Sequence, residues 1–530
     1  MPRKIAVVGG GPGGLLFALL HRRRHPEDTV VVHERNRADD TFGFGVVFSD
    51  ATLRGINAVD PVLQDALDAH GRRWDRIEVR AKGERHHVPG NGMSAIARRQ
   101  LLLTLQERAR AAGADLRFES PVGSLSELSD YDVVVAADGA NSRLRTELED
   151  EIGPTYEEAT AKFIWFGTTY EFNGLTFVHE PTEHGLFAVH AYPVGDNLST
   201  FLVETDGETW RRAGLDEFDT TSPPGPSDEK SREFLEQLFA KQIDGHPLVV
   251  NNSRWSSFRT RRARRWSSGN VALIGDAVHT AHFSVGSGTK MAMEDAIALV
   301  DALDEHPDDV SAAFAAYEDV ARPPVEKIQA SARPSLSWWE RFGMYHDQLE
   351  PAQLTFHFMA RAMSAQRMRR RADTFVEDTL ADWRARHDGT DPLETPLRIG
   401  TTVLPGRTLE MSADGGALRS GDHTVPVLTT PPTADGSADA VWVLAVDAPT
   451  EEAAVPAVVA EARQAVRADG SNGPAAVVVR GEATLPVRLV AEDLRFDGAV
   501  PVLVADVPDE DAALTHVLAG RADAVAMTVA

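Results

Sequence analysis

Residues 4–14 read Lys4-Ile-Ala-Val-Val-Gly-Gly-Gly-Pro-Gly-Gly14 and decide the fold of the N-terminal region. The apolar residues predict a short β-strand, and the glycines predict a turn into a helix that begins near Gly13. In such a unit Gly9 permits the tight turn, Gly11 lets the backbone approach a pyrophosphate, and Gly14 lets helix and strand pack closely. The N-terminus of the helix would offer unpaired N–H groups to the phosphates.

An acidic residue completes this unit. The next apolar run, Val30-Val-Val-His33, is followed by Glu34, which is placed to hydrogen-bond a ribose hydroxyl. The succession of strand, helix, strand and acid therefore predicts a site for an adenine dinucleotide. This motif alone does not distinguish NAD from FAD.

Two later stretches predict buried strands that end in an aspartate-containing turn. Asp130-Tyr-Asp-Val-Val-Val-Ala-Ala-Asp-Gly-Ala-Asn-Ser-Arg-Leu-Arg145 has its turn at Asp138-Gly139. Gly269-Asn-Val-Ala-Leu-Ile-Gly-Asp-Ala-Val-His279 has its turn at Gly275-Asp276, ahead of Gly286-Ser-Gly288. GxGxxG, DG and GD motifs in this order resemble the class A flavoprotein aromatic hydroxylases. The resemblance implies FAD as the cofactor and NADH or NADPH as the cosubstrate, with the choice between these two left open.

The resemblance also implies which residues hold the cofactor. Asp276 would bind a ribityl hydroxyl, Arg98 would support the cofactor, and Asp138 would help to order FAD and the pyridine nucleotide. The turn that begins at Gly286 would face the flavin ring. The complete implied set is Gly9, Gly11, Gly14, Glu34, Arg35, Arg98, Asp138, Asp276, Gly286 and Gly288.

Composition limits the other classes of function. The chain has 530 residues, enough for two or three domains. It has no cysteine, which excludes disulfides, thiolate catalysis, cysteine-ligated zinc and iron–sulfur clusters, and no metal site is expected. The formal net charge of -26 disfavours nucleic acid and anionic membranes as partners. We find no signal peptide and no run of about twenty apolar residues, so a cytoplasmic location is expected.

The pattern along the chain predicts an α/β fold of two parts. Residues 1 to about 390 would form the hydroxylase. Its FAD-binding parts would be about 1–155 and 255–330, with a Rossmann-like parallel sheet. An antiparallel sheet over the substrate would span about 156–254, with a Pro/Gly/Ser loop at Ser222–Asp228, and helices would follow at about 331–390.

Residues 397–530 are expected to form a small α/β domain with a flexible segment at Thr429–Asp439. Pro396-Leu-Arg-Ile-Gly and residues 511–527 resemble the start and the end of an old-yellow-enzyme-like barrel. About 130 residues are too few for a (β/α)₈ barrel, which needs about 250. The resemblance therefore implies a degenerate remnant without FMN, with a role in structure or in a homodimer.

Three segments resemble a particular branch, the salicylyl-CoA 5-hydroxylases and anthraniloyl-CoA monooxygenases. They are residues 41–53, residues 275–295 and the C-terminal region described above. Residues 275–295 carry Phe283 and Lys290 where other class A hydroxylases have proline and asparagine. The resemblance implies that NAD(P)H reduces FAD, that O₂ adds to form a C4a-hydroperoxide, and that its terminal oxygen attacks the ring para to a donor group. Salicylyl-CoA would become gentisyl-CoA.

Other substrates and functions stay open at this point. The substrate could instead be anthraniloyl-CoA or a free or carrier-tethered aryl acid. An FAD-dependent reductase without oxygen insertion and a non-catalytic FAD-binding protein are the alternatives from other classes.

Three residues near the GD motif are the catalytic candidates. His279 and His282 flank the turn, so each is expected either to contact the donor group or carbonyl of the substrate or to bond a neighbouring loop. Lys290 begins a helix by the flavin, where it would position the thioester or the pyrimidine edge of FAD, or else face solvent.

The substrate contacts are expected from three regions. His190 and Tyr192 lie on a strand over the cavity, although the sequence does not tell which face of the strand points inward. Phe44 belongs to a glycine-rich loop near the flavin. CoA phosphates would need a basic patch, either Arg259-Thr-Arg-Arg-Ala-Arg-Arg265 or Arg367-Met-Arg-Arg-Arg371. Either run could equally be a solvated face. The expected substrate residues are His190, Tyr192, Phe44, Arg369 and Arg370.

Overall fold

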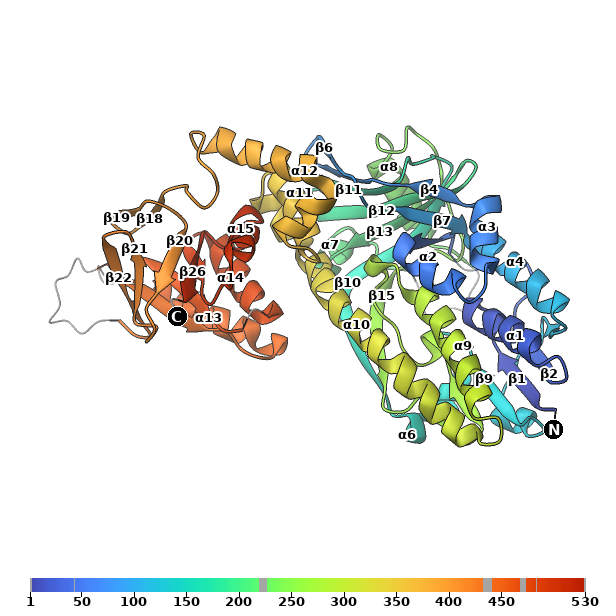
Figure 1. The fold of residues 1–530 in the computed structure, drawn as a ribbon. Helices are drawn as coiled ribbons and strands as arrows, with labels where there is room; N and C mark the ends of the chain where they lie inside the picture. Colours follow the sequence, from blue (N-terminus) through green and yellow to red (C-terminus); the bar gives the residue numbers. More distant parts are fainter. Residues whose placement is uncertain are drawn as a thin grey trace. The chain divides into compact units, whose positions relative to one another are not determined.

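A computed structural model describes residues 2–41, 43–218, 226–431, 441–467, 473–482 and 484–528. The chain divides into two compact units, Met1–Arg341 and Phe342–Ala530 (Figure 1). The loop at Ser222–Asp228 and the segment at Thr429–Asp439 lie largely outside the described residues.

A six-stranded sheet is the centre of the first unit, in the order β16-β17-β9-β1-β2-β8. All its strands except β16 run parallel to their neighbours. Because α1 packs against both α4 and α9 in this unit, the strands are covered and read as continuous apolar runs. The strands are β1 (Lys4–Val8), β2 (Thr29–His33), β8 (Asp115–Arg117), β9 (Val133–Ala136), β16 (Ser267–Ser268) and β17 (Val271–Leu273).

The helices of the first unit are distributed between its sheets. They are α1 (Pro12–Arg24), α2 (Asp50–Asn57), α3 (Val62–His70), α4 (Arg98–Ala111), α5 (Arg143–Glu147), α6 (Glu149–Ile152), α7 (Gly207–Arg212), α8 (Glu229–Leu238), α9 (Gly288–Glu305) and α10 (Val310–Gln348). The boundary between the two units falls within α10. Within the described ranges, none of the helices is both long and apolar enough to span a membrane.

A larger, mostly antiparallel sheet has the order β14-β10-β13-β12-β11-β5-β6, with β15 paired to β10. The expected α/β fold with an antiparallel second sheet is confirmed. Its strands are β5 (Ile77–Ala81), β6 (Glu84–Val88), β10 (Pro154–Thr168), β11 (Leu175–Thr182), β12 (Gly185–Gly195), β13 (Leu198–Thr205), β14 (Leu248–Val249) and β15 (Ser256–Ala263). A small sheet joins β3 (Gly45–Ser49), β7 (Met93–Ala97) and β4 (Arg72–Trp74).

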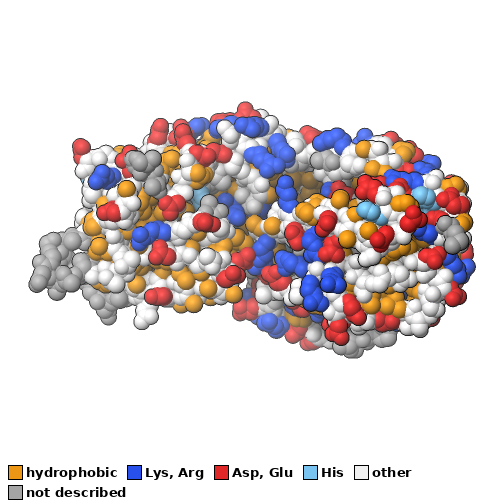
Figure 2. Space-filling model, turned by 60° about the horizontal axis from the view of Figure 1, so that its bottom comes forward, with side chains coloured by type: hydrophobic (Ala, Val, Ile, Leu, Met, Phe, Trp, Pro, Cys, Tyr) orange, Lys and Arg blue, Asp and Glu red, His pale blue; other side chains and the backbone are white. Residues whose placement is uncertain are grey.

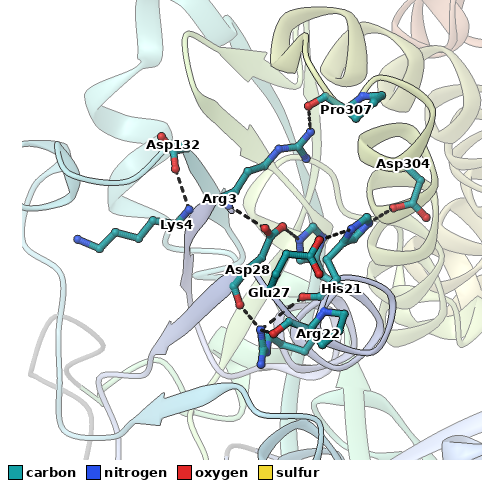
Figure 3. Close-up of polar contacts among 11 residues, drawn as sticks. Arg3, Lys4, His21, Arg22, Glu27, Asp28, Asp132, Asp304 and Pro307 are labelled. Carbon is teal, nitrogen blue, oxygen red and sulfur yellow. Dashed lines mark hydrogen bonds and ion pairs between the residues drawn. The ribbon is translucent and has the colours of Figure 1, made fainter. Parts of the chain in front are cut away.

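Polar contacts close the end of α1 that is remote from the glycine turn (Figure 3). His21 Nε2 lies 2.8 Å from Asp28 Oδ2, and Asp28 Oδ1 accepts a hydrogen bond of 2.7 Å from the backbone N–H of Arg3. His25 Nε2 lies 2.5 Å from Asp304 Oδ1 at the end of α9. These contacts connect the residues before β1 and β2 to the C-terminal ends of α1 and α9. Burial lowers the pKa of His21.

The second unit contains a closed seven-stranded barrel in the order β20-β21-β22-β23-β24-β25-β26. Only β21 runs antiparallel to both neighbours. Leu409, Val478 and Ala526 are among the apolar side chains that fill the interior, as a small barrel requires. The strands are β20 (Thr408–Met411), β21 (Ala417–Ser420), β22 (His423–Leu428), β23 (Val443–Asp447), β24 (Ala476–Arg480), β25 (Val502–Val504) and β26 (Ala524–Thr528).

Helices and a hairpin complete the second unit. The hairpin of β18 (Leu397–Ile399) and β19 (Thr402–Leu404) packs into the same apolar core as the barrel strands. The helices are α11 (Pro351–Ala360), α12 (Ala365–Arg386), α13 (Val455–Arg467), α14 (Leu485–Asp497) and α15 (Glu510–Leu518). The boundary was expected near residues 390–397, but α11 and α12 pack against α15. These two helices therefore belong to the second unit.

Candidate active site

A cavity of about 330 Å³ lies where the parallel strands β1, β9 and β17 end. Its lining comes from the N-termini of α1 and α9 and from the turns after β9 and β17. This is the edge of a parallel sheet at which ligands of such folds bind. Of the expected cofactor residues, six line this cavity: Gly11, Gly14, Arg98, Asp276, Gly286 and Gly288.

The glycines of the first turn have two distinct roles. Gly9 has a φ of +110°, and a Cβ there would lie 2.2 Å from the carbonyl oxygen of Ala137. A Cβ on Gly14 would lie 2.3 Å from the carbonyl oxygen of Gly9. A Cβ on Gly11 would meet nothing within 4 Å. Gly9 and Gly14 are therefore required by the turn itself, whereas Gly11 is open to a ligand.

The N-termini of α1 and α9 face the cavity, and no acidic side chain in their first turns offsets their positive dipole ends. Neither α1 nor α9 has an acidic residue in its first turn, and neither has a side-chain cap. The hydroxyl of Ser287, which precedes α9 and lines the cavity, is buried and has no hydrogen-bond partner among the described residues. The N–H groups and positive ends of these helices suit a pyrophosphate and an electron-rich ring edge, so the residues present fit FAD.

Glu34 and Asp138 adjoin this cavity. Glu34 Oε2 accepts a hydrogen bond of 2.7 Å from the N–H of Gly10, and its Oε1 accepts one of 2.8 Å from the N–H of Asn36. Asp138 Oδ2 accepts one of 2.8 Å from the N–H of Arg143, while its buried Oδ1 has no hydrogen-bond partner in the described part of the chain. Arg35 is exposed. The cofactor roles of Glu34, Arg35 and Asp138 stay predictions.

Asp276 and Arg98 bring opposite charges into the cavity. Burial raises the pKa of Asp276, and the nearby charge of Arg98 opposes that shift. Burial likewise lowers the pKa of Arg98, and Asp276 opposes this shift. The backbone N–H of Arg98 donates to the carbonyl of Phe44 at 2.9 Å, which ties the start of α4 to the loop before β3.

Two buried arginines hold the DG and GD turns together. Arg145 donates to the carbonyl oxygens of Ala277 (2.8 Å) and Ala140 (3.0 Å). Arg261 donates to those of Asp276 (2.5 Å) and Ala140 (2.6 Å). Both arginines therefore share Ala140 and bridge the two loops. Burial lowers the pKa of Arg261, and the charge of Arg145 adds to this effect.

The basic run Arg259–Arg265 is one of the two runs expected either to bind CoA phosphates or to form a solvated face. Its contacts favour a structural and solvated role. Arg261 is a structural bridge, as described above. Arg259 pairs with Glu158 at 2.9 Å, and Arg262 lies 3.3 Å from Glu157. The face shown in Figure 2 likewise presents basic side chains interspersed with acidic ones.

A second cavity of about 330 Å³ adjoins the first. Its lining is mostly apolar and aromatic, and it includes His190 and Lys290. The two cavities share a wall, so a ring at the N-terminus of α9 would face both. The shared residues are Val47, Trp165, Tyr192, Phe283, Gly286 and Ser287.

Tyr192 is a neutral hydrogen-bond donor in this wall. Its hydroxyl donates to the carbonyl of Gly45 at 3.3 Å. Burial raises the pKa of Tyr192 to about 12, so the phenol keeps its proton at neutral pH.

His190 contacts a buried carboxylate that the sequence analysis did not single out. His190 Nε2 lies 2.6 Å from Glu204 Oε2, and His282 Nε2 lies 3.6 Å from Glu204 Oε1. Glu204 is 1% exposed. It lies two residues after Leu202, which lines the second cavity, and residues two apart on a strand share a face. A glutamate that directly follows the apolar run Phe201-Leu-Val203 was the available signal.

His279 does not reach either cavity, contrary to the expectation of a catalytic role. Its Nε2 lies 2.7 Å from Asp295 Oδ2, which also accepts a hydrogen bond of 2.7 Å from the N–H of Gly275. The imidazole packs on Trp266 with ring centroids 4.8 Å apart. His279 is therefore a support for the GD turn, which is the bonded-loop alternative.

Phe44 is likewise absent from both cavity linings. It packs over β10, since a Cβ on Gly167 would lie 2.7 Å from the Phe44 ring. Lys290 does line the second cavity, and it forms an ion pair with Glu294 one turn along α9.

The cavity linings do not include Arg369 and Arg370, which belong to the second unit. Both are exposed on α12. Arg369 donates to Glu377 Oε1 at 2.8 Å, and Arg370 donates to Gln366 Oε1 at 3.3 Å. Their contact with a substrate stays a prediction.

Known proteins with similar sequences agree with this geometry. The FAD binding domain family matches residues 129–331. A salicyloyl-CoA 5-hydroxylase from a Streptomyces species is 52% identical over 99% of this chain and 100% of its own. A 3-hydroxy-4-methyl-anthranilyl-[aryl-carrier protein] 5-monooxygenase from Streptosporangium sibiricum is 39% identical, over 64% of this chain and 89% of its own.

Solved structures support the fold. The p-nitrophenol 4-monooxygenase PnpA from Pseudomonas putida DLL-E4 matches with a TM-score of 0.54 at 18% identity, over 71% of this chain and 97% of its own. A 2-methyl-3-hydroxypyridine-5-carboxylic acid oxygenase matches with a TM-score of 0.52 at 19% identity, over 68% of this chain and 99% of its own. With the near full-length match to the Streptomyces enzyme, these findings place the chain in the family of FAD-dependent aromatic hydroxylases.

Proposed function

We propose that this protein hydroxylates the ring of an aryl-CoA thioester, with salicyloyl-CoA converted to gentisyl-CoA by attack at C5. The observation that carries the proposal is the 52% identity to a salicyloyl-CoA 5-hydroxylase over 99% of the chain. The two adjoining cavities described above supply a place for the cofactor and a place for an aromatic substrate.

When bound, FAD supplies the activation of O₂ with electrons taken from NADH or NADPH. Gly11, Arg98 and Asp276 would hold it, since all three line the first cavity. The flavin ring would lie at the shared wall, next to Gly286 and Ser287. The second cavity is lined by Leu175, Phe177, Leu202 and other apolar side chains, which exclude water from the reacting ring.

Three polar side chains of the second cavity would orient the substrate. His190 and Tyr192 would face the ring hydroxyl, and Lys290 would face the thioester carbonyl. Tyr192 stays protonated and donates its proton to Gly45, so its hydroxyl oxygen can accept a hydrogen bond from the ring hydroxyl. Lys290 can donate to the carbonyl, because an ammonium carries three protons and Glu294 engages only part of them. Attack para to the hydroxyl yields the 5-hydroxylated product.

A carrier-bound substrate is the second candidate. The relative from Streptosporangium sibiricum is named for an aryl-carrier protein substrate, and its match covers 64% of this chain. The match to the salicyloyl-CoA 5-hydroxylase covers 99%. The match that covers more of the chain favours CoA over a carrier protein as the group that bears the substrate. Arg369 and Arg370 would then contact the CoA phosphates.

We further propose that the closed barrel of the second unit is a degenerate old-yellow-enzyme-like remnant that holds no FMN. Its interior is filled with apolar side chains. Its role would be structural or in a homodimer of a cytoplasmic enzyme. Flavin extraction should yield FAD without FMN, and FMN in the extract would contradict the first statement. Sedimentation decides between the two roles, since a dimer would favour the homodimer and a monomer would leave the structural role.

The function is tested by aerobic NADH and NADPH oxidation with mass spectrometry of the products. Salicyloyl-CoA, anthraniloyl-CoA and free salicylate are offered in parallel, together with salicylate on a carrier protein. We expect a product one oxygen heavier from salicyloyl-CoA. Turnover of anthraniloyl-CoA, the carrier-bound ester or free salicylate alone would replace the substrate. NADH oxidation without any oxygenated product would favour the reductase alternative.

A further inference from the structure

We infer that the second cavity opens to solvent between α2, the short 3₁₀ helix Phe283–Val285 and α10, and that this mouth holds the pantetheine arm of the substrate thioester. Three exposed lining residues mark the mouth: Ser49, Val285 and Ser331. The inference rests on the proposed function, because it needs an acyl group carried on a thioester. CoA and the prosthetic group of a carrier protein share the same arm, so the mouth would recognise that shared chemistry.

The second cavity is closed on its sheet side and open on its helix side. On the sheet side, Tyr192, Thr200 and Leu202 of β12 and β13 are 7%, 0% and 3% exposed. On the helix side, Val285 is 37% exposed. Ser331, on α10, is exposed as well. A group that leaves the cavity for solvent therefore leaves between the helices.

The volume of the cavity separates the two parts of the substrate. About 330 Å³ lies at the lower end of the range of about 300–1,000 Å³ that encloses a drug-sized ligand. A salicyloyl group fits such a space, whereas CoA is several times larger than its acyl group. The nucleotide must stay outside, so the arm has to cross the lining. The wall shared with the first cavity would face the flavin, which leaves the helix side for the arm.

The polar residues of the cavity give the thioester one direction. The ring hydroxyl would lie at His190 and Tyr192 on the sheet side, and the carbonyl at Lys290, whose side chain is 22% exposed. The sulfur and the arm then point to the helix side. The reverse orientation would place the amides of the arm against Leu175 and Leu202, and buried amides without hydrogen bonds are costly.

The side chains of the mouth suit an uncharged arm made of amides and alkyl groups. The Ser331 hydroxyl donates to the carbonyl of Ile328 at 2.9 Å, so its oxygen stays available to accept an amide N–H. Ser49 and Thr52 add two hydroxyls whose oxygens lie 3.1 Å apart. Val285 offers an apolar contact to the alkyl part. The described lining contains no acidic side chain, so nothing in it repels the phosphate that follows the arm.

The first test uses the absence of cysteine from the chain. Ser331→Cys places a single thiol at the mouth. Ala330→Cys is the matched control, because Ala330 is the exposed neighbour on α10 and lines neither described cavity. The probe is 2-hydroxyphenacyl-CoA, a thioether that a thiol does not cleave. At about ten times its Kd it should slow maleimide labelling of FAD-loaded Ser331→Cys by about tenfold. Labelling of Ala330→Cys should not change.

Shorter and longer probes separate the arm from what it is attached to. The 2-hydroxyphenacyl thioether of pantetheine should protect Ser331→Cys as the CoA probe does, whereas free salicylate, which has no arm, should not. Protection by the CoA probe but not by the pantetheine probe would assign the mouth to the nucleotide and overturn the inference. A carrier protein that bears the same thioether identifies the source, because the natural donor should protect at the lower concentration.

The second test measures affinity without turnover. Ser331→Trp narrows the mouth, and Ala330→Trp adds the same bulk beside it. Flavin difference spectra of the oxidised holoenzyme report the Kd of each ligand. Ser331→Trp should raise the Kd of salicyloyl-CoA by about tenfold and leave that of free salicylate unchanged. Ala330→Trp should change neither. Equal rises for both ligands in Ser331→Trp would indicate a general loss of the site and contradict the inference.

The outcomes separate the mouth from the proposed function. Full labelling of Ser331→Cys while the flavin spectrum shows that the thioether is bound would overturn the mouth alone. A wild-type enzyme that binds but does not hydroxylate salicyloyl-CoA would overturn the function, and labelling would still decide on the mouth. A flavin spectrum that responds to free salicylate but to no thioester would overturn both.

Discussion

Both units bury a glutamate that has a histidine among its partners, Glu204 in the first and Glu492 in the second. They are 1% and 4% exposed. The ion-pair partners of Glu204 are His190, which lines the second cavity, and His282. Those of Glu492 include Arg521, a permanent cation. The first carboxylate therefore supports a side chain of the substrate cavity, whereas the second compensates a buried charge of its own unit.

Glu492 lies among three partners of the second unit. Tyr345 donates to its Oε2 at 2.6 Å, His357 Nε2 lies 3.3 Å from its Oε1, and Arg521 Nε lies 3.5 Å from that same oxygen. Burial alone would raise the pKa of Glu492, but His357, Arg521 and Tyr345 together lower it to about 2. The cluster joins α14 to the end of α10, to α11 and to the loop before β26.

The largest effect is expected from Glu492→Ala. Removal of the carboxylate leaves the Arg521 charge buried without its counter-ion, which should destabilise the second unit by about 3–5 kcal/mol. Chemical denaturation, with hydrogen exchange of peptides from the second unit, measures this change. Turnover per FAD-loaded molecule should stay within about twofold of wild type, because Glu492 lines neither described cavity. A loss of turnover with unchanged stability would contradict the structural role of Glu492.

The converse variant is His190→Gln. It removes one of the side chains proposed to orient the substrate in the second cavity, so kcat should fall by about 10²-fold with stability close to that of wild type. Stopped-flow and steady-state kinetics with salicyloyl-CoA, together with thermal unfolding, report both quantities. If unfolding shifts strongly and kcat per folded molecule does not, the Glu204 cluster is structural like that of Glu492.

Acid should destabilise the second unit through His516. Burial, with the charges of Arg521 and Arg488, lowers the pKa of His516 to about 3 from 6.5. A histidine with a lowered pKa contributes stability that is present above 6.5 and is lost as the pH falls toward 3. Between pH 7 and pH 5 the loss should be about 2 kcal/mol. Unfolding at both pH values measures it, and His516→Gln should flatten the dependence. Glu492 itself contributes only to losses below about pH 4.5.

The smallest effect on stability is expected from the exposed residues Arg369 and Arg370. Arg369→Ala combined with Arg370→Ala should change stability by less than about 0.5 kcal/mol, because both side chains are exposed. If these residues contact CoA phosphates, KM for salicyloyl-CoA should rise by about fivefold, and the rise should shrink at high salt. Arg367→Ala, also exposed on α12, is the control. An unchanged KM would leave the two arginines as solvated surface.

The cofactor region was the most predictable part of the molecule. Gly9 has a φ of +110°, and a Cβ on Gly14 would meet the carbonyl oxygen of Gly9, so their spacing reflects a local steric requirement. A requirement of that kind acts over a few residues and is visible in one sequence. The DG and GD turns, with Asp138 and Asp276, were found in the same way.

The substrate side was predictable only in part. His190, Tyr192 and Lys290 were identified and do line the second cavity, whereas His279 and Phe44 were not brought to it. His279 and His282 stand three residues apart in the same segment, yet one bonds Asp295 and the other approaches Glu204. Local sequence cannot tell them apart, because their partners come from α9 and β13.

The sequence by itself determined the cofactor turn, the α/β class of the fold and the family, because these follow from local backbone requirements and short-range apolar patterns. Tertiary structure alone decided the partners of the buried charges. Glu204 meets two histidines from other elements, and Glu492 meets an arginine, a tyrosine and a histidine. A buried charge is tolerated only where the fold supplies its partners, and those partners are distant in the sequence.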